Sequence, residues 1–179
     1  MLSGAPMMLP AQACEEAKAY LRVMGGEEDA LVARLVLSAA ELCERFTRQA
    51  LIVRSFTEVL PASSSWTRLG ATPVAAISGV EAMPGDGDPV ALAGGAYAVD
   101  IDANGDGWVR IVSALEAKRV RVSFEAGLAQ DWEGAPIVLR QGIVRLAAHF
   151  YAHRDAADDA GPPAAVTALW RPWRRMRLG

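Results

Sequence analysis

The sequence predicts an α+β fold, and three segments carry the prediction. Residues 28–48 and 136–156 place apolar side chains at the spacing of amphipathic helices. Residues 51–126 instead combine β-branched and aromatic side chains with clusters of Pro, Gly, Ser and Asp, a texture typical of short strands joined by turns. We therefore expect two N-terminal helices, a small and mainly antiparallel β region, a third long helix and an extended C-terminal tail.

The helices are predicted from their ends as well as from their apolar faces. A first helix over residues 10–24 begins at Pro10, which suits a first helical turn, and Gly25 and Gly26 interrupt it. A second helix over 28–48 has acidic residues at its start, where the helix dipole favours them. The third begins at Pro136, and its apolar stripe consists of Leu139, Ile143, Leu146, Ala147 and Phe150.

The clearest strand lies at residues 119–126, where apolar and polar side chains alternate. This alternation predicts a strand with one buried and one solvent-facing side. Residues 108–112 have a similar pattern, whereas 51–60 and 74–83 alternate less regularly.

Length and composition indicate one body followed by a tail. A chain of 179 residues, 52% of them hydrophobic, is long enough to bury one core. Gly161, Pro162 and Pro163 cannot continue a helix, so we expect the body to span residues 1–160 and the tail 161–179.

Charge and cysteine content exclude several classes. The formal net charge of −3 provides no global positive field to hold nucleic acid. No apolar run approaches the roughly 18 residues needed to cross a bilayer. The N-terminal stretch lacks the basic start of a secretory signal, and two cysteines, Cys14 and Cys43, are too few for a disulfide scaffold. A reduced protein made in the cytoplasm is the expectation.

A calcium loop is one candidate site. Asp102, Asn104, Asp106 and Gly107 fit the opening of an EF-hand loop, but its twelfth position is Ser113 instead of the required glutamate. The flanking residues resemble strands, so a hairpin turn is the preferred interpretation.

Metal and catalytic chemistry have weaker support. His149 and His153 share a helix face, yet no HExxH signature and no obvious third ligand accompany them. Cys43 lies in an apolar helix face without a partnered histidine in view. We therefore expect no metal, no cofactor and no enzymatic activity.

The C-terminal tail is rich in Trp and Arg, and the needs of folding do not explain this composition. Trp and Arg are the residues most enriched at interface hot spots, so the tail is predicted to bind a partner. Its candidate docking residues are Trp170, Arg171, Pro172, Trp173, Arg174, Arg175, Met176, Arg177 and Leu178.

These patterns together resemble the head–tail connector, or adaptor, family of tailed phages. The strongest stretch runs from Pro136 to Arg154 and is similar to that family's helix of the form P-x-x-[LI]-[RK]-Q-x-[IL]-x-x-L-x-A-H-x-Y-x-x-R. The helical opening over residues 17–52 and the closing strip over 168–174 are also similar to the family. The residues that carry the helix motif are Pro136, Arg140, Gln141, Leu146, His149, Tyr151 and Arg154.

The resemblance implies a structural part of a virion. Members of the family form a ring between the portal at a capsid vertex and the tail-side stopper or head-completion protein, and the resemblance implies a dodecamer. The resemblance further implies that the C-terminal tail docks on the portal and that DNA passes through the ring without specific binding. Gene transfer agent particles have the same architecture, so an infectious phage and a gene transfer agent both stay open.

Two other classes remain as alternatives. One is a small nucleic-acid-binding module whose arginine-rich tail contacts phosphates. The other is a small metal-dependent enzyme that uses His149, His153 or the loop at Asp102.

Overall fold

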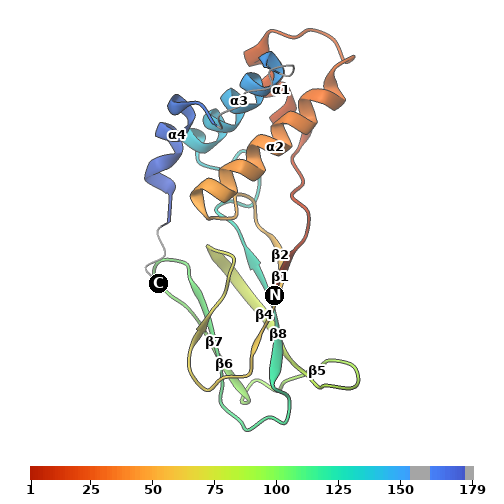
Figure 1. Ribbon diagram of the computed structural model, residues 1–179, viewed down its shortest axis with the longest axis vertical. Coiled ribbons are helices and arrows are strands. Elements are labelled where there is room, and N and C mark those ends of the chain that lie inside the picture. Colours follow the sequence, from red (N-terminus) through yellow and green to blue (C-terminus); the bar gives the residue numbers. More distant parts are fainter. Residues whose placement is uncertain (154–161, 176–179) are drawn as a thin grey trace. The chain divides into compact units, whose positions relative to one another are not determined.

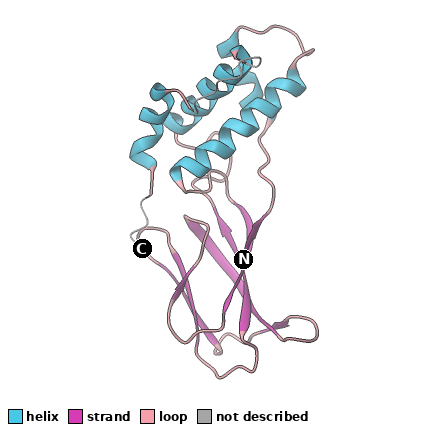
Figure 2. Cartoon of the chain, viewed as in Figure 1, coloured by secondary structure: helices cyan, strands magenta, loops and turns pink. Residues whose placement is uncertain are grey.

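The computed structural model describes residues 1–153 and 162–175, and the chain divides into two compact units. The first unit comprises Met1–Pro6 and Val53–Leu128, and the second comprises Met7–Ile52 and Ala129–Gly179. Figure 2 shows that the described strands belong to the first and the described helices to the second. We call them the strand unit and the helical unit.

The strand unit contains two antiparallel sheets. The five-stranded sheet has the order β1-β2-β8-β4-β5 and the three-stranded sheet the order β3-β7-β6. The strands are β1 (Leu2–Gly4), β2 (Arg54–Pro61), β3 (Thr67–Arg68), β4 (Val74–Met83), β5 (Val90–Ala91), β6 (Tyr97–Ile101), β7 (Gly107–Ile111) and β8 (Arg119–Ala126).

Strand β8 lies at the centre of the larger sheet, between β2 and β4 (Figure 1). Its alternating apolar side chains are the buried ones, which confirms the predicted strand at 119–126 with the same bounds. Phe124 pairs with Phe56 of β2, and the two rings stack with centroids 5.7 Å apart. A strand with neighbours on both edges and one fully buried face anchors the core of this unit.

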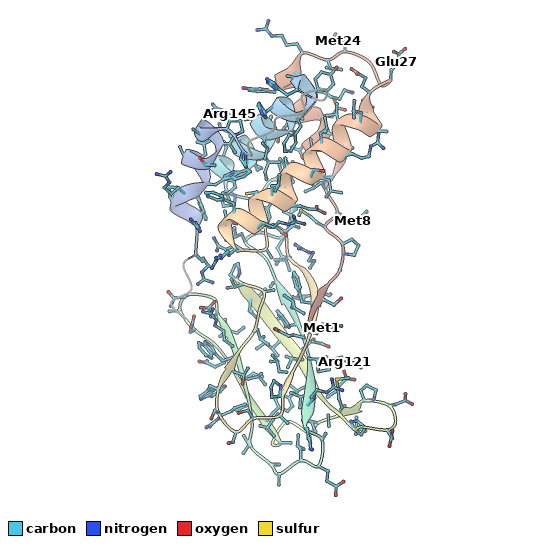
Figure 3. All side chains as sticks on the ribbon, viewed as in Figure 1. Met1, Met8, Met24, Glu27, Arg121 and Arg145 are labelled. Atoms are coloured by element: carbon cyan, nitrogen blue, oxygen red, sulfur yellow. The ribbon has the colours of Figure 1, made fainter. Side chains whose placement is uncertain are left out.

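The helical unit is built around α3 (Ile137–Ala152), which packs against α1 (Ala11–Leu21), α2 (Asp29–Thr47) and α4 (Ala164–Trp170). A short 3₁₀ turn, η1 (Arg171–Trp173), follows α4. The predicted apolar stripe is confirmed at Leu139, Ile143, Leu146 and Ala147, which are all buried. Figure 3 shows Met24 and Glu27 on the connection between α1 and α2, and Met24 is 93% exposed.

The α+β class is confirmed, while several elements differ from the expectation. The first helix ends at Leu21 because Arg22 has left-handed backbone angles. The strands β1, β3 and β5 are too short to produce a periodic pattern. The predicted third helix extends to residue 156, and its last three positions lie outside the described residues.

The tail is not extended throughout. Residues 164–173 form α4 and η1, so the Pro162–Pro163 pair begins a helix instead of ending the fold. Pro163 is the N-cap of α4, a position where a missing backbone N–H costs little. Within the described part of the chain, no helix has the length and apolar character to cross a membrane.

Candidate functional site

The C-terminal segment from Ala164 to Arg175 is attached to the helical unit through Trp170. The Trp170 side chain is fully buried, and its ring centroid lies 5.9 Å from that of Phe46 on α2. Its indole N–H donates to the Leu139 carbonyl at 3.4 Å. The space for the indole exists because Gly142 on α3 has no side chain: a Cβ there would overlap the indole ring.

Beyond Trp170 the backbone is bound to the C-terminal end of α2. The Gln49 side-chain amide donates to the Trp173 carbonyl at 2.6 Å, and the Arg175 N–H donates to the Thr47 carbonyl at 2.9 Å. The last carbonyls of a helix have no partner within the helix, so the second bond satisfies one of them. The Arg174 guanidinium lies 5.7 Å from the centre of the Phe46 ring.

Burial divides the candidate docking residues into two groups. Arg171, Pro172 and Arg174 are exposed, and Trp173 and Arg175 are half-buried. Trp170 differs from the expectation: its indole is enclosed in its own unit, so it cannot enter a partner's pocket while α4 stays packed. Met176, Arg177 and Leu178 lie outside the described residues.

The residues of the helix motif mostly hold the helical unit together. Arg140 contacts Glu16 of α1 at 3.2 Å, and the same carboxylate oxygen accepts the Trp132 indole N–H at 3.0 Å. The Tyr151 hydroxyl donates to Glu28, the N-cap of α2, at 2.6 Å. Pro136 is the N-cap of α3, Leu146 is buried, Gln141 is exposed, His149 is half-buried and Arg154 lies outside the described residues.

The loop at Asp102 is a hairpin turn between β6 and β7. One carboxylate oxygen of Asp102 accepts the backbone N–H groups of Asn104 and Asp106, and the other accepts the Trp108 indole N–H at 3.1 Å. Gly105 has a φ of +76°, which glycine adopts without strain. Both oxygens therefore serve the turn, as the preferred interpretation of this loop expects.

The other titratable candidates lie in structural settings. The His149 and His153 rings are 4.2 Å apart, and His153 Nδ1 lies 2.9 Å from the His149 carbonyl oxygen. Burial raises the pKa of the Cys43 thiol, which disfavours the reactive thiolate. Within residues 1–153 and 162–175, no group of three or more His, Cys, Asp or Glu side chains is placed to hold a metal ion.

An exposed tryptophan–arginine pair in the strand unit is not evident from the sequence. Trp66, which precedes β3, is 43% exposed, and the Arg110 guanidinium of β7 lies 4.8 Å from the centre of its ring. The alternation in β7 predicts that Arg110 faces outward, but the loop that carries Trp66 has no period. Only the fold brings the two together.

Solved structures resemble the chain over its whole length. One is the neck of an empty gene transfer agent (GTA) particle computed with C6 symmetry, with a TM-score of 0.81 and 25% identity. Others are the virion of a native GTA particle and the neck of a native GTA particle computed with C12 symmetry, each 27% identical, with TM-scores of 0.77 and 0.76. Each match covers 99% of this chain and 97% of the other. No protein-family model and no curated protein matches the sequence.

The fold and its full-length counterparts mark the chain as a structural component of a phage-like particle, of the class found in the necks of gene transfer agent particles. This class is not enzymatic.

Proposed function

We propose that this chain is the adaptor of a phage-like particle, which forms a ring between the portal and the tail-side stopper at the head–tail junction. In this role it docks on the portal through its C-terminal segment and leaves a channel for DNA. The observation that carries the proposal is the match over 99% of the chain to neck structures of GTA particles. A partial match would support only a shared fold, whereas here both units have counterparts.

A ring of twelve copies is the proposed assembly. One of the similar necks was computed with C12 symmetry and another with C6 symmetry, which supports an arrangement around an axis. A ring of identical subunits closes through two different, complementary surfaces on each copy. The exposed pair of Trp66 and Arg110 has the composition of such a surface.

The C-terminal segment supports docking through its exposed residues. Arg171, Pro172 and Arg174 present side chains to solvent, while Trp170 holds the segment in place. A segment with an ordered backbone loses less conformational entropy on binding than a free tail. Docking therefore depends on Trp170 indirectly, through position, and on the arginines by contact.

The channel is proposed to let DNA pass without specific binding. A net charge of −3 provides little attraction for phosphates, which suits a conduit. The arrangement of the copies in the ring determines which residues line the channel.

Light scattering tests the proposal. The chain is measured alone and with the purified portal protein of the same particle. We expect a complex whose mass corresponds to one copy per portal subunit. A chain that stays separate from the portal at every ratio would contradict the adaptor role.

The matched variant for this test is Arg171→Glu with Arg174→Glu. Deleting residues 162–179 is a poor variant because it also removes Trp170 from the core. The charge reversal changes exposed side chains and leaves that core intact. We expect the variant to fold with the wild-type melting temperature and to lose the portal complex.

A further inference from the structure

We propose that the docking surface extends from the C-terminal segment onto the end of α2, and that it binds a carboxylate-rich protein surface on the portal. Arg45 and Arg48 of the α2 end join Arg171 and Arg174, and we call these four residues the arginine surface. The inference rests on the proposed function, because it names the partner chemistry of the same site.

The structure brings these residues to one end of the helical unit. Arg45 lies in the last turn of α2 and Arg48 caps that helix. The bonds from Gln49 to Trp173 and from Arg175 to Thr47 fix the C-terminal segment against the same end. Figure 1 shows α4 beside α2, and the two helices are in contact.

The side chains of the arginine surface are free of ion pairs within the described part of the chain. Arg45, Arg48, Arg171 and Arg174 are all exposed. The described ion pairs use other cations, namely Lys18, Arg68, Arg121 and Arg140. Within residues 1–153 and 162–175, none of the four forms an ion pair. Glu41 and Glu44 lie on the same last turns of α2, so the four arginines outnumber the neighbouring carboxylates and give this end of the helical unit a net positive charge.

The backbone conformation of Arg48 makes this residue useful for a test. Its φ of 58° and ψ of 36° lie in the left-handed region, where helices usually place glycine. An arginine there is less favourable for the backbone than glycine. Arg22 ends α1 with the same conformation, so this geometry alone assigns no role to the side chain. A cation near a helix C-terminus also interacts favourably with the dipole, but Arg45 already provides one in the last turn.

The chemistry of the surface favours a protein partner. Guanidinium groups pair with carboxylates through two parallel hydrogen bonds, and the half-buried Trp173 with exposed Pro172 adds apolar contact area. A phosphate backbone would be bound by the arginines alone. The portal partner is therefore expected to present aspartates and glutamates beside an apolar recess.

The experiment measures binding to the purified portal protein by biolayer interferometry at low and high salt. The test variant is Arg45→Glu with Arg48→Glu, and the matched control is Arg34→Glu, an exposed arginine in the first half of the same helix. We expect the test variant to bind about tenfold or more weakly at low salt, with a smaller difference at high salt. The control is expected to bind like wild type.

A second variant separates binding from stability. Arg48→Gly removes the charge but relieves the left-handed backbone, so its melting temperature should equal or exceed that of wild type. Its affinity for the portal should nevertheless fall, and Arg48→Lys should restore part of it.

Three results would overturn the inference. The first is wild-type affinity of the Arg45→Glu, Arg48→Glu variant in a preparation where wild type binds the portal, which leaves the adaptor role standing. The second is unchanged portal binding together with lost binding to a double-stranded DNA probe, which would assign the surface to nucleic acid. The third is a wild-type chain that does not bind the portal, which removes the proposed function as well.

Discussion

Trp170 occupies a space that exists only because residue 142 is a glycine. The indole lies over α3 at the place where a Cβ would stand, and it contacts Phe46 of α2 on another side. Because Gly142 and Trp170 are in direct contact, the effects of substituting the two residues are not expected to add. The large, fully buried indole thus links three helices of the unit.

Trp170→Ala is therefore expected to destabilise the protein. The loss of a buried tryptophan costs about 3–5 kcal/mol, because apolar contact is lost and a cavity remains. Urea denaturation followed by circular dichroism measures this change. The control is Trp173→Ala, a half-buried residue outside the core, which should change the free energy of unfolding by less than half as much. Equal effects of the two substitutions would contradict the assigned roles.

At the scale of elements, periodic segments were predictable and short ones were not. Strand β8 and helix α3 each bury one face, so their sequences repeat every two residues or every three to four. Helix α4 has only seven residues and follows two prolines, so its pattern is too short to outweigh the helix-breaking signal. The ends of the long helices agree with the sequence within a few residues because prolines, glycines and charges mark them.

The composition of the candidate site was predictable from the sequence, but the separate roles of its residues were not. The sequence identifies a segment rich in Trp and Arg, yet nothing local distinguishes Trp170 from Trp173. Trp170 is buried because Gly142, which is 28 residues earlier in the chain, leaves space for its indole. The contribution of Arg45 and Arg48 likewise depends on tertiary contacts that bring two distant segments together.

The β4–β8 pair predicts a specific pH dependence. Glu81 accepts a hydrogen bond from Arg121 at 2.7 Å, and this bond holds the pKa of the Glu81 carboxyl below its usual value of 4.5. A depressed folded-state pKa adds stability that is fully present above the unfolded pKa and is lost as pH falls through the folded pKa. Arg121 is labelled in Figure 3, and both side chains are partly exposed, so solvent reduces the effect.

Glu81→Gln should therefore lower the free energy of unfolding slightly at neutral pH and not at strongly acidic pH. Urea denaturation at a series of pH values measures the difference between variant and wild type. A control at Glu125, which is exposed, should show no such change. A difference that grows as the pH falls would contradict the assigned pair.

At the scale of the whole molecule, charge is unevenly distributed. The chain has a net charge of −3, yet four exposed arginines gather at the end of α2 and on the C-terminal segment. This contrast is why a nucleic-acid-binding module is a reasonable alternative from sequence. Binding of the protein to DNA at several salt concentrations tests this alternative.

We expect the purified protein to bind double-stranded DNA weakly, without the steep loss of affinity with salt that phosphate contacts produce. Fluorescence anisotropy with a labelled duplex at several salt concentrations measures the slope. The Arg171→Glu, Arg174→Glu variant is the control for a contribution of the C-terminal segment. Tight binding that falls steeply with salt and disappears in this variant would favour the nucleic-acid module.

The late position of α4 in the chain also matters during synthesis. A ribosome that stops before residue 164 releases a chain that lacks Trp170, Arg171 and Arg174 at once. Such a fragment exposes the surface of α3 around Gly142 and lacks the exposed arginines of the C-terminal segment. Under the proposed function, the same segment then serves both folding and recruitment, so a truncated product is expected to be degraded by proteases and to bind the portal poorly.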